Sequence, residues 1–366
     1  MKRKYLFLLM AAALVMGFAA CSEDDDDEVV PNIDLSTVTS DLTLQNGDVV
    51  TGKLNEDVKI SIADGAKVTL RDAVILRGGM SGLWAGLTCQ GNATIIVEGK
   101  DSVRGCSPKY PGIYIPKDKT LTINGTGSLF AKAGGQSGTG WGGAPGIGGQ
   151  SGAYYINGGF IASGGGNIVV KGGDITAEGI EGGAGIGCGP LANCGNITIS
   201  GGTVRAIGNE EAPGIGSAYC KDCGDITISG GTVYAIAGKI MAPAIGTVRG
   251  GKCGNITITG GIVDAVCYWH KTAAIGSGGI NSKFESITIT SGITSLTVSE
   301  KIVVTTPPID QVRTTPLIGK GLEDAGSGDV NIDGKVNPDA SWNGDGMKSL
   351  KLTKPDDSNN IWQLER

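Results

Sequence analysis

Apolar and polar residues alternate in short runs through the middle of the chain, and glycines separate the runs. The segment Asn196–Ser200 alternates, Gly201-Gly202 interrupts the pattern, and Thr203–Ala206 alternates again. Alternation with a period of two predicts short β-strands with one buried face. After a variable loop comes a third apolar piece, for example Ala212–Gly216. Each such stretch therefore predicts three short strands joined by turns.

The three-strand stretch recurs along the chain at a nearly constant interval. Segments that begin at Asn167, Asn196, Asp225 and Asn255 align without gaps, with periods of 29, 29 and 30 residues, and Ser286 follows after 31. A period of this length is typical of a solenoid. No helical stretch separates the strands, so equivalent strands should stack in parallel, about 4.8 Å apart. The pattern predicts an all-β fold, a right-handed single-stranded parallel β-helix with roughly 30 residues per coil.

Equivalent apolar positions should stack into ladders inside this solenoid. The predicted ladders are Ile197, Ile226, Ile256 and Ile287, and Val204, Val233 and Val263. The β-helix is expected over residues 63–304, with an N-terminal cap at 34–62 and a last coil plus C-terminal cap at 305–366. Caps are expected because the ends of a solenoid have to hide their strand edges.

The N-terminus has the features of a lipoprotein signal peptide, residues 1–20. A basic start precedes an apolar stretch from Tyr5 to Phe18, and Ala19-Ala20 lie directly before Cys21. This arrangement resembles a bacterial lipobox, which implies cleavage before Cys21 and attachment of lipid to that residue. An ordinary signal peptide with an incidental cysteine is the alternative.

An acidic segment, residues 21–33, follows the signal peptide. Six acidic residues within Ser22–Glu28 repel one another and predict a solvated tether. The run resembles the export signal that sends lipoproteins of Bacteroides-type bacteria to the outer face of the outer membrane, and a plain spacer is the alternative. No second apolar stretch has the roughly 20 residues of a membrane span, so the expected membrane contact is through lipid alone.

Composition narrows the range of partners. The formal charge of −6 becomes −9 when the three basic residues of the signal peptide leave (−6 − 3 = −9), which argues against nucleic acid. Glycine accounts for 64 of 366 residues, while apolar residues remain at 40%. A chain of this composition is ordered and rich in turns.

Two sequence motifs resemble a known family. Cys194–Val204, with the sequence Cys-Gly-Asn-Ile-Thr-Ile-Ser-Gly-Gly-Thr-Val, and Gly112–Ile123 are similar to segments of glycine-rich, β-helical surface lipoproteins of Bacteroides-type bacteria, some of the carbohydrate-binding domain type. The resemblance covers roughly residues 60 to 300. It implies the same architecture, and a glycan as the ligand class.

Eight cysteines remain besides Cys21. Cys194, Cys223 and Cys253 share one phase of the coil, where Phe284 follows, so a row of buried thiols is expected. Disulfides between Cys220 and Cys223, or between Cys188 and Cys194, and a zinc site built from adjacent coils are the alternatives. The prediction is that no metal and no cofactor is bound.

Few residues have the placement that catalysis requires. Glu181 and Glu210 are the stacked carboxylates, with Lys239 next in register, and we expect a solvated pair rather than the two acids of a glycosidase. His270 is the single histidine, and its neighbours Tyr268-Trp269 predict an exposed loop rather than a catalytic base. We therefore expect no catalytic residues and no enzymatic activity.

The scarce aromatic residues are the candidate ligand contacts. Exposed rings beside a polar threonine ladder suit stacking and hydrogen bonding to sugars. The candidates are Tyr219, Tyr234, Tyr268, Trp269 and His270. The expected function is non-catalytic binding of polysaccharide or host glycans at the cell surface. A structural or adhesive protein that binds other proteins is one alternative, and a glycan-cleaving β-helix enzyme is another.

Overall fold

The chain folds into stacked coils of short β-strands. The computed structural model describes residues 32–76, 83–135, 142–151, 153–156, 159–161, 164–219, 221–301, 315–322, 324–339, 343–344, 347, 349–353 and 363–365. Of these described residues, 48% lie in strands and 1% in helix. The signal peptide, Cys21, the acidic segment and Cys220 lie outside the described residues. Within the described part, no helix is both long and apolar enough to span a membrane.

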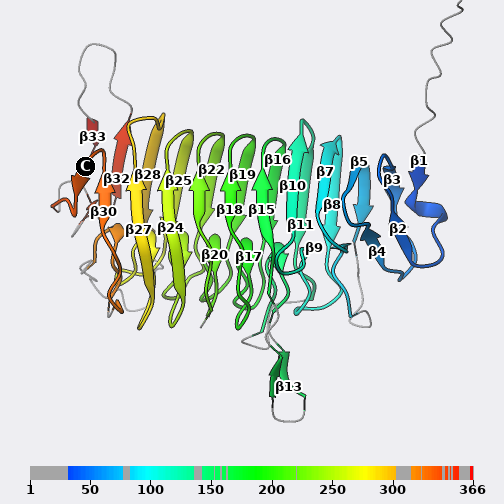
Figure 1. Ribbon diagram of the computed structural model, residues 1–366, viewed down its shortest axis with the longest axis horizontal. Helices are drawn as coiled ribbons and strands as arrows, with labels where there is room; N and C mark the ends of the chain where they lie inside the picture. The colour runs from blue at the N-terminus through cyan, green and yellow to red at the C-terminus, as the bar shows by residue number, and fades with distance from the viewer. Residues whose placement is uncertain are drawn as a thin grey trace, which may run out of the picture. The chain divides into compact units, whose positions relative to one another are not determined.

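Each regular coil contributes three strands, and each strand pairs in parallel with its equivalents in the neighbouring coils (Figure 1). In one coil these are β18 (Ile197–Ile199), β19 (Thr203–Ile207) and β20 (Ile215–Ser217). The next coil contributes β21 (Ile226–Ile228), β22 (Thr232–Ile236) and β23 (Ile245–Thr247). Thr203 pairs with Thr232 without an offset, which confirms the predicted all-β parallel β-helix.

First and second strands belong to one 21-stranded sheet, and third strands form a 10-stranded sheet. The remaining members of the large sheet are β1 (Asn32–Asp34), β3 (Val49–Lys53), β5 (Ala66–Ile75), β7 (Ala93–Glu98), β8 (Lys100–Arg104), β10 (Thr120–Gly125), β11 (Ser128–Lys132), β15 (Asn167–Val170), β16 (Asp174–Glu178), β24 (Lys252–Ile258), β25 (Ile262–Cys267), β27 (Lys283–Ile289), β28 (Ser295–Glu300), β30 (Val330–Ile332), β31 (Lys335–Val336), β32 (Ser349–Thr353) and β33 (Gln363–Glu365). The third-strand sheet also contains β2 (Leu42–Leu44), β4 (Ile60–Ile62), β6 (Leu87–Cys89), β9 (Ile113–Tyr114), β12 (Ile147–Gly149), β17 (Ile186–Cys188), β26 (Ile275–Ser277) and β29 (Ile318–Gly319).

The predicted inner ladders form the core. The isoleucine ladder through Ile226 and the valine ladder through Val233 are at most 1% exposed along their predicted length. A third ladder, on the third-strand sheet, consists of Ile186, Ile215, Ile245, Ile275 and Ile318. The core is therefore built from three stacked apolar columns, one for each strand of the coil.

A column of asparagine and aspartate side chains links successive coils at the start of the first strands. Asn167 Oδ1 accepts the backbone N–H of Asn196 at 2.8 Å, and Asn196 Oδ1 accepts that of Asp225 at 2.9 Å. Asp225 Oδ1 accepts the N–H of Asn255 at 2.7 Å. Each side chain satisfies a backbone donor of the next coil. The repeated Asn or Asp at this phase is therefore explained by a structural role.

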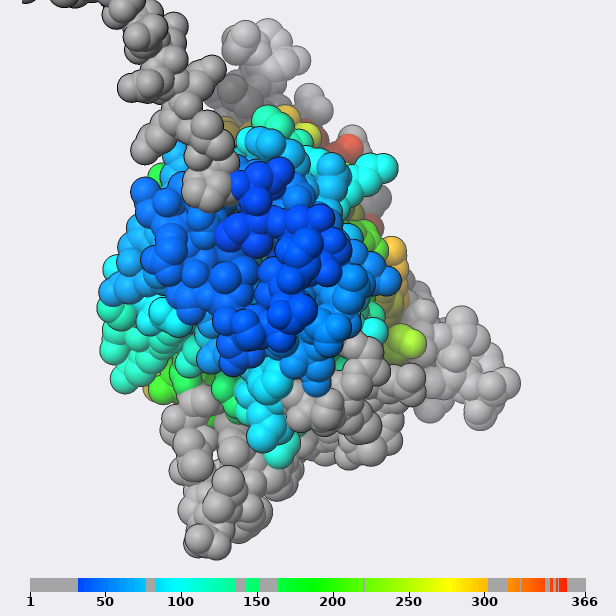
Figure 2. All heavy atoms as spheres, turned by 90° about the vertical axis from the view of Figure 1, so that its right-hand side faces the viewer, coloured from blue at the N-terminus to red at the C-terminus, as the bar shows by residue number. Residues whose placement is uncertain are grey.

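The two ends and one insertion depart from the regular coils. Residues 34–62 contain the 3₁₀ helix η1 (Leu35–Thr37) and strands that pair in parallel with the next coils, as Leu42 does with Ile60. At the other end, β32 pairs antiparallel with β28. The hairpin of β13 (Ala153–Ile156) and β14 (Gly159–Ile161) lies between two coils and projects from the ladder in Figure 1. Figure 2 shows the N-terminal end of the stack of coils, and the residues that face the viewer there belong to the first coils, in blue.

Candidate functional site

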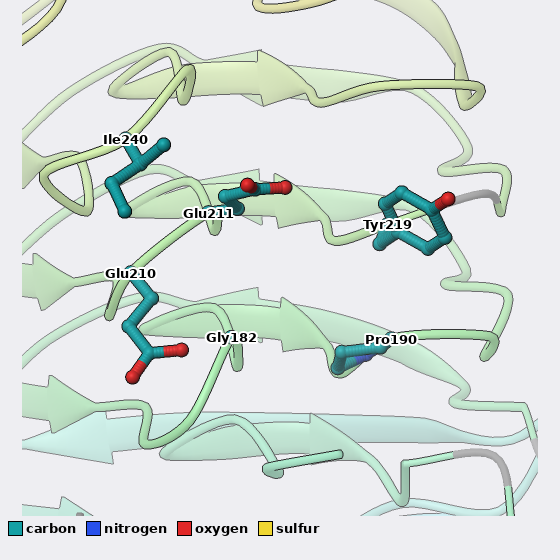
Figure 3. Close-up of a pocket in the computed structure, with 6 residues that line it drawn as sticks. All are labelled: Gly182, Pro190, Glu210, Glu211, Tyr219 and Ile240. Carbon is teal, nitrogen blue, oxygen red and sulfur yellow. The ribbon is translucent and has the colours of Figure 1, made fainter. Parts of the chain in front are cut away.

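A solvent-open cavity lies beside the third-strand sheet, between the turns that precede its strands and those that follow them (Figure 3). It has a volume of about 90 Å³, which admits one substituent of a larger ligand rather than a whole oligosaccharide. The lining comes from three consecutive coils: Gly182, Pro190, Glu210, Glu211, Tyr219 and Ile240. The wall is therefore mixed, with an aromatic ring, two aliphatic side chains and two carboxyl groups.

Turns at equivalent phases of the coil bring these side chains together. Gly182 follows β16, Glu210 and Glu211 follow β19, and Ile240 follows β22. Pro190 and Tyr219 lie two residues beyond the ends of their third strands. Because β17, β20 and β23 are stacked in register, the turns on both sides are stacked as well. Ile240 keeps 41% of its surface exposed, so the cavity has an apolar rim on the surface.

The Tyr219 ring is half-buried and has a cationic neighbour. Ser217 pairs with Thr247, so Tyr219 and Arg249 lie two residues beyond paired positions of adjacent coils. Arg249 Cζ lies 6.0 Å from the centre of the Tyr219 ring, within the range of a cation–π contact. The Tyr219 carbonyl also accepts the N–H of Leu191 at 3.0 Å. These contacts hold the ring at the edge of the cavity.

Glu211 has an unusual electrostatic environment. Burial raises the pKa of Glu211, Arg249 opposes this shift, and the neighbouring charge of Glu210 adds to it. Glu211 Oε2 is buried, and no described residue donates a hydrogen bond to it. A buried acceptor without a donor is costly, so a ligand group with an N–H or O–H would gain from reaching it.

Glu181 and Glu210 do not form the solvated pair that was expected, and this prediction is wrong. Glu181 is 3% exposed, and its backbone N–H donates to Asn209 Oδ1. Its turn is covered by the preceding coil, since Gly142 and Gly143 both donate to the Glu181 carbonyl. Glu210 is partly exposed and lines the cavity with Glu211, a residue that the sequence analysis did not single out.

The other predicted aromatic contacts lie elsewhere. Tyr234 points outward from β22, is 38% exposed, and lies between Arg205 and Asp264 of the adjacent coils. Tyr268 and Trp269 are partly buried in the turn after β25. Of the five predicted contacts, Tyr219 is the one that lines the cavity.

His270 is not part of an exposed loop, which corrects the sequence-based expectation. Its side chain is 8% exposed, and its ring packs against Trp269 with centroids 5.4 Å apart. Thr315 Oγ1 donates to the His270 carbonyl at 3.3 Å. Residues from the C-terminal part of the chain therefore cover this turn.

The threonine ladder lies on a different sheet from the cavity. Thr198, Thr227, Thr257 and Thr288 occupy paired, outward positions of the first strands. Tyr219 follows a third strand, so the ladder does not line the cavity.

The described cysteines form no disulfide with one another, and most of them are buried. In the parallel strand pairing, Cys253 lies opposite Cys223 of one neighbouring coil and opposite Phe284 of the other, as the coil phase predicted. Cys188 and Cys194 are both unpaired thiols in this structure. Among the described side chains, no group of three or more metal-ligating residues is placed to hold a metal ion.

Compared with protein-family models, with curated proteins and with solved structures, the chain matches none of them.

Proposed function

We propose that this protein is a cell-surface lipoprotein that binds polysaccharide or host glycans without cleaving them, and that the Tyr219 cavity contacts the ligand. The observation that carries the proposal is one half-buried tyrosine ring sharing a solvent-open cavity with two carboxyl groups. Aromatic and aliphatic side chains pack against the C–H face of a sugar, and carboxylates accept hydrogen bonds from its hydroxyl groups. Tyr219, Pro190 and Ile240 supply the first kind of surface, and Glu210 and Glu211 supply the second.

The size of the cavity determines how a glycan would bind. A volume of about 90 Å³ takes one substituent of a sugar unit. The rest of the glycan would therefore lie along the surface of the neighbouring coils. Binding through one small anchor point is expected to be weak for a single sugar unit. Several protein copies on one cell would bind one polysaccharide much more strongly, because the later contacts become intramolecular.

Replacing Tyr219 with alanine tests the site. Loss of a ring contact removes about 0.5–1.5 kcal/mol beyond the lost buried area, so we expect the affinity to fall about tenfold while the fold survives. A glycan array on the purified mature protein identifies a ligand, and isothermal titration then compares the variants.

Tyr234→Ala is the matched control, because it removes the same side chain from an exposed strand away from the cavity. Equal losses in both variants, or a Tyr219→Ala variant that binds as the wild type does, would contradict the proposed site. If the wild type releases free sugar and the Glu210→Gln variant does not, the protein cleaves its glycan, and the proposal of binding without cleavage is wrong.

The anchoring part of the proposal predicts the behaviour of Cys21→Ser. Without a cysteine at the cleavage site no lipid is attached, so the variant should leave the membrane fraction or stay uncleaved. Metabolic labelling with a fatty-acid analogue and fractionation measure both effects. A labelled, membrane-bound Cys21→Ser variant would rule out this anchor.

Deletion of residues 22–28 tests the export role of the acidic segment. We expect the variant to keep its lipid but to lose protease accessibility on intact cells. Protease shaving followed by blotting reads the difference directly. Unchanged accessibility would mean that the segment serves as a spacer.

A further inference from the structure

A row of thiols crosses three consecutive coils near the start of the first strands: it lies just before β18 and β21 and inside β24. Cys223 and Cys253 are direct parallel partners. The N–H of Cys194 donates to the Asp222 carbonyl, and the N–H of Cys223 donates to the Lys252 carbonyl. Both bonds run from a cysteine to the residue before the next cysteine, so all three have the same register.

Each of the two inner thiols reaches back toward the preceding coil. Cys223 Sγ donates to the carbonyl of Gly195, the residue after Cys194, and Cys253 Sγ donates to the carbonyl of Gly224, the residue after Cys223, each at 3.9 Å. Stacked residues of parallel strands are about 4.8 Å apart at Cα, inside the range of roughly 4.4–6.8 Å that a disulfide spans. A bond between neighbouring members of the row therefore needs a small movement of side chains and no rearrangement of the coils.

Access to the row is restricted to one end. Cys194 is partly exposed, whereas Cys223 is 5% and Cys253 0% exposed. Beyond Cys253, the Phe284 side chain ends the row. A reagent in solution therefore meets Cys194 first. Cys223 is the next thiol of the row, and Cys188, whose Sγ donates to the Asn193 carbonyl at 2.9 Å, is the competing neighbour.

We propose that Cys194 and Cys223 are a redox-active pair that closes a disulfide between two adjacent coils by exchange with a small-molecule disulfide such as glutathione disulfide. The Cys194 thiolate attacks one sulfur of that disulfide, whose S–S bond breaks, and one glutathione leaves with the electron pair and takes up a proton. The Cys223 thiolate then attacks Cys194 Sγ and releases the second glutathione in the same way. Two protein thiols are oxidised, and one disulfide is reduced to two thiols.

The surroundings of each sulfur match its role. The thiolate is the reactive form, and contacts with the Cys194 and Cys253 side chains lower the pKa of Cys223. Burial raises the pKa of Cys194, so the first attack should be slow at neutral pH and accelerate as the pH rises. Burial raises the pKa of Cys89 to about 12, which makes Cys89 an unreactive internal reference.

Peptide mapping of the purified mature protein tests the proposal, because trypsin separates the cysteines concerned. Cys194 lies in peptide 172–205, Cys223 in 222–239, and Cys253 in 253–271. After incubation with glutathione disulfide at pH 8.5 and alkylation, we expect peptide 172–205 linked to 222–239, with Cys89 still reduced. The link should disappear in C194S and persist in C188S and C253S.

The order of events provides a second measurement that needs no variant. In the wild type, a glutathione adduct on Cys194 should appear first and decay as the linked peptide accumulates, while C223S should keep the adduct. The proposal is overturned by an adduct that persists in the wild type, by a Cys188–Cys194 bond within peptide 172–205, or by a link between 222–239 and the peptide that carries Cys220.

Discussion

Replacing Gly216 with alanine should lower the free energy of unfolding by at least about 3 kcal/mol, or prevent folding altogether. Gly216 has φ +134°, and an added Cβ would lie 1.9 Å from the Gly246 carbonyl oxygen. The obstacle is backbone, so β20 and β23 would have to separate to relieve it. The same glycine recurs in consecutive coils of the third-strand sheet, at Gly148, Gly187, Gly246, Gly276 and Gly319.

Gly65→Ala is the control that separates crowding from backbone strain. Gly65 also has a positive φ of +79°, but no atom lies within 4 Å of its added Cβ. Its substitution should cost roughly 1 kcal/mol, the effect of the unfavourable φ alone. Urea unfolding followed by circular dichroism measures both variants. Similar losses in the two would show that close packing between the coils is not what requires glycine at 216.

The Asp101→Asn variant should be more stable than the wild type at pH 8, and this advantage should shrink toward pH 5. Asp101 occupies an inward position, where its partner in the next coil is Leu129, and it is 2% exposed. Its Oδ1 accepts the N–H of Ala73 at 2.8 Å, beside Asp72, whose φ of +55° bends β5. Asparagine keeps an oxygen for this hydrogen bond but has no charge to bury.

The direction of this pH dependence follows from the pKa of Asp101, which burial raises from 3.8 to about 7. The hydrogen bond from Ala73 lowers this pKa, and the charges of Asp72 and Glu98 raise it further. Between these values the folded state holds a proton that the unfolded state has released, so stability falls as the pH rises through that window. At about 1.4 kcal/mol per pH unit, the difference of about 3 units limits the total effect to about 4 kcal/mol. Between pH 5 and pH 8 the difference between variant and wild type should grow by about 2–3 kcal/mol.

Urea unfolding of both proteins at the two pH values gives this difference directly. Glu285→Gln is the control, because it neutralises an acid on the surface. Glu285 is ion-paired with Lys252, and that contact lowers its pKa, so removing its charge should not stabilise the protein at pH 8. A pH-independent difference between Asp101→Asn and wild type would mean that Asp101 is ionised in the folded protein throughout the range.

The regular coils were predictable from the sequence because residues one period apart are the residues that pair between neighbouring strands. Once Asn196 and Asp225 are aligned, alternation decides which side chains point inward, and the ladders through Ile226 and Val233 follow. The alignment of repeats along the sequence did not reveal the N-terminal coils, because these coils are shorter than the regular ones. Leu42 and Ile60, which pair directly, are separated by 18 residues, so the segment shares no period with the rest.

The cavity and the buried groups depended on contacts that no local pattern encodes. Tyr219 was singled out by its chemistry, but Pro190 and Ile240 reach the same cavity from two other coils through turns of variable sequence. His270 is buried because residues 315–322 pack over its turn, at a distance of about 45 positions along the chain. Alternation along a strand determines which way a side chain points, whereas the segments that cover a turn are determined only when distant parts of the chain pack together.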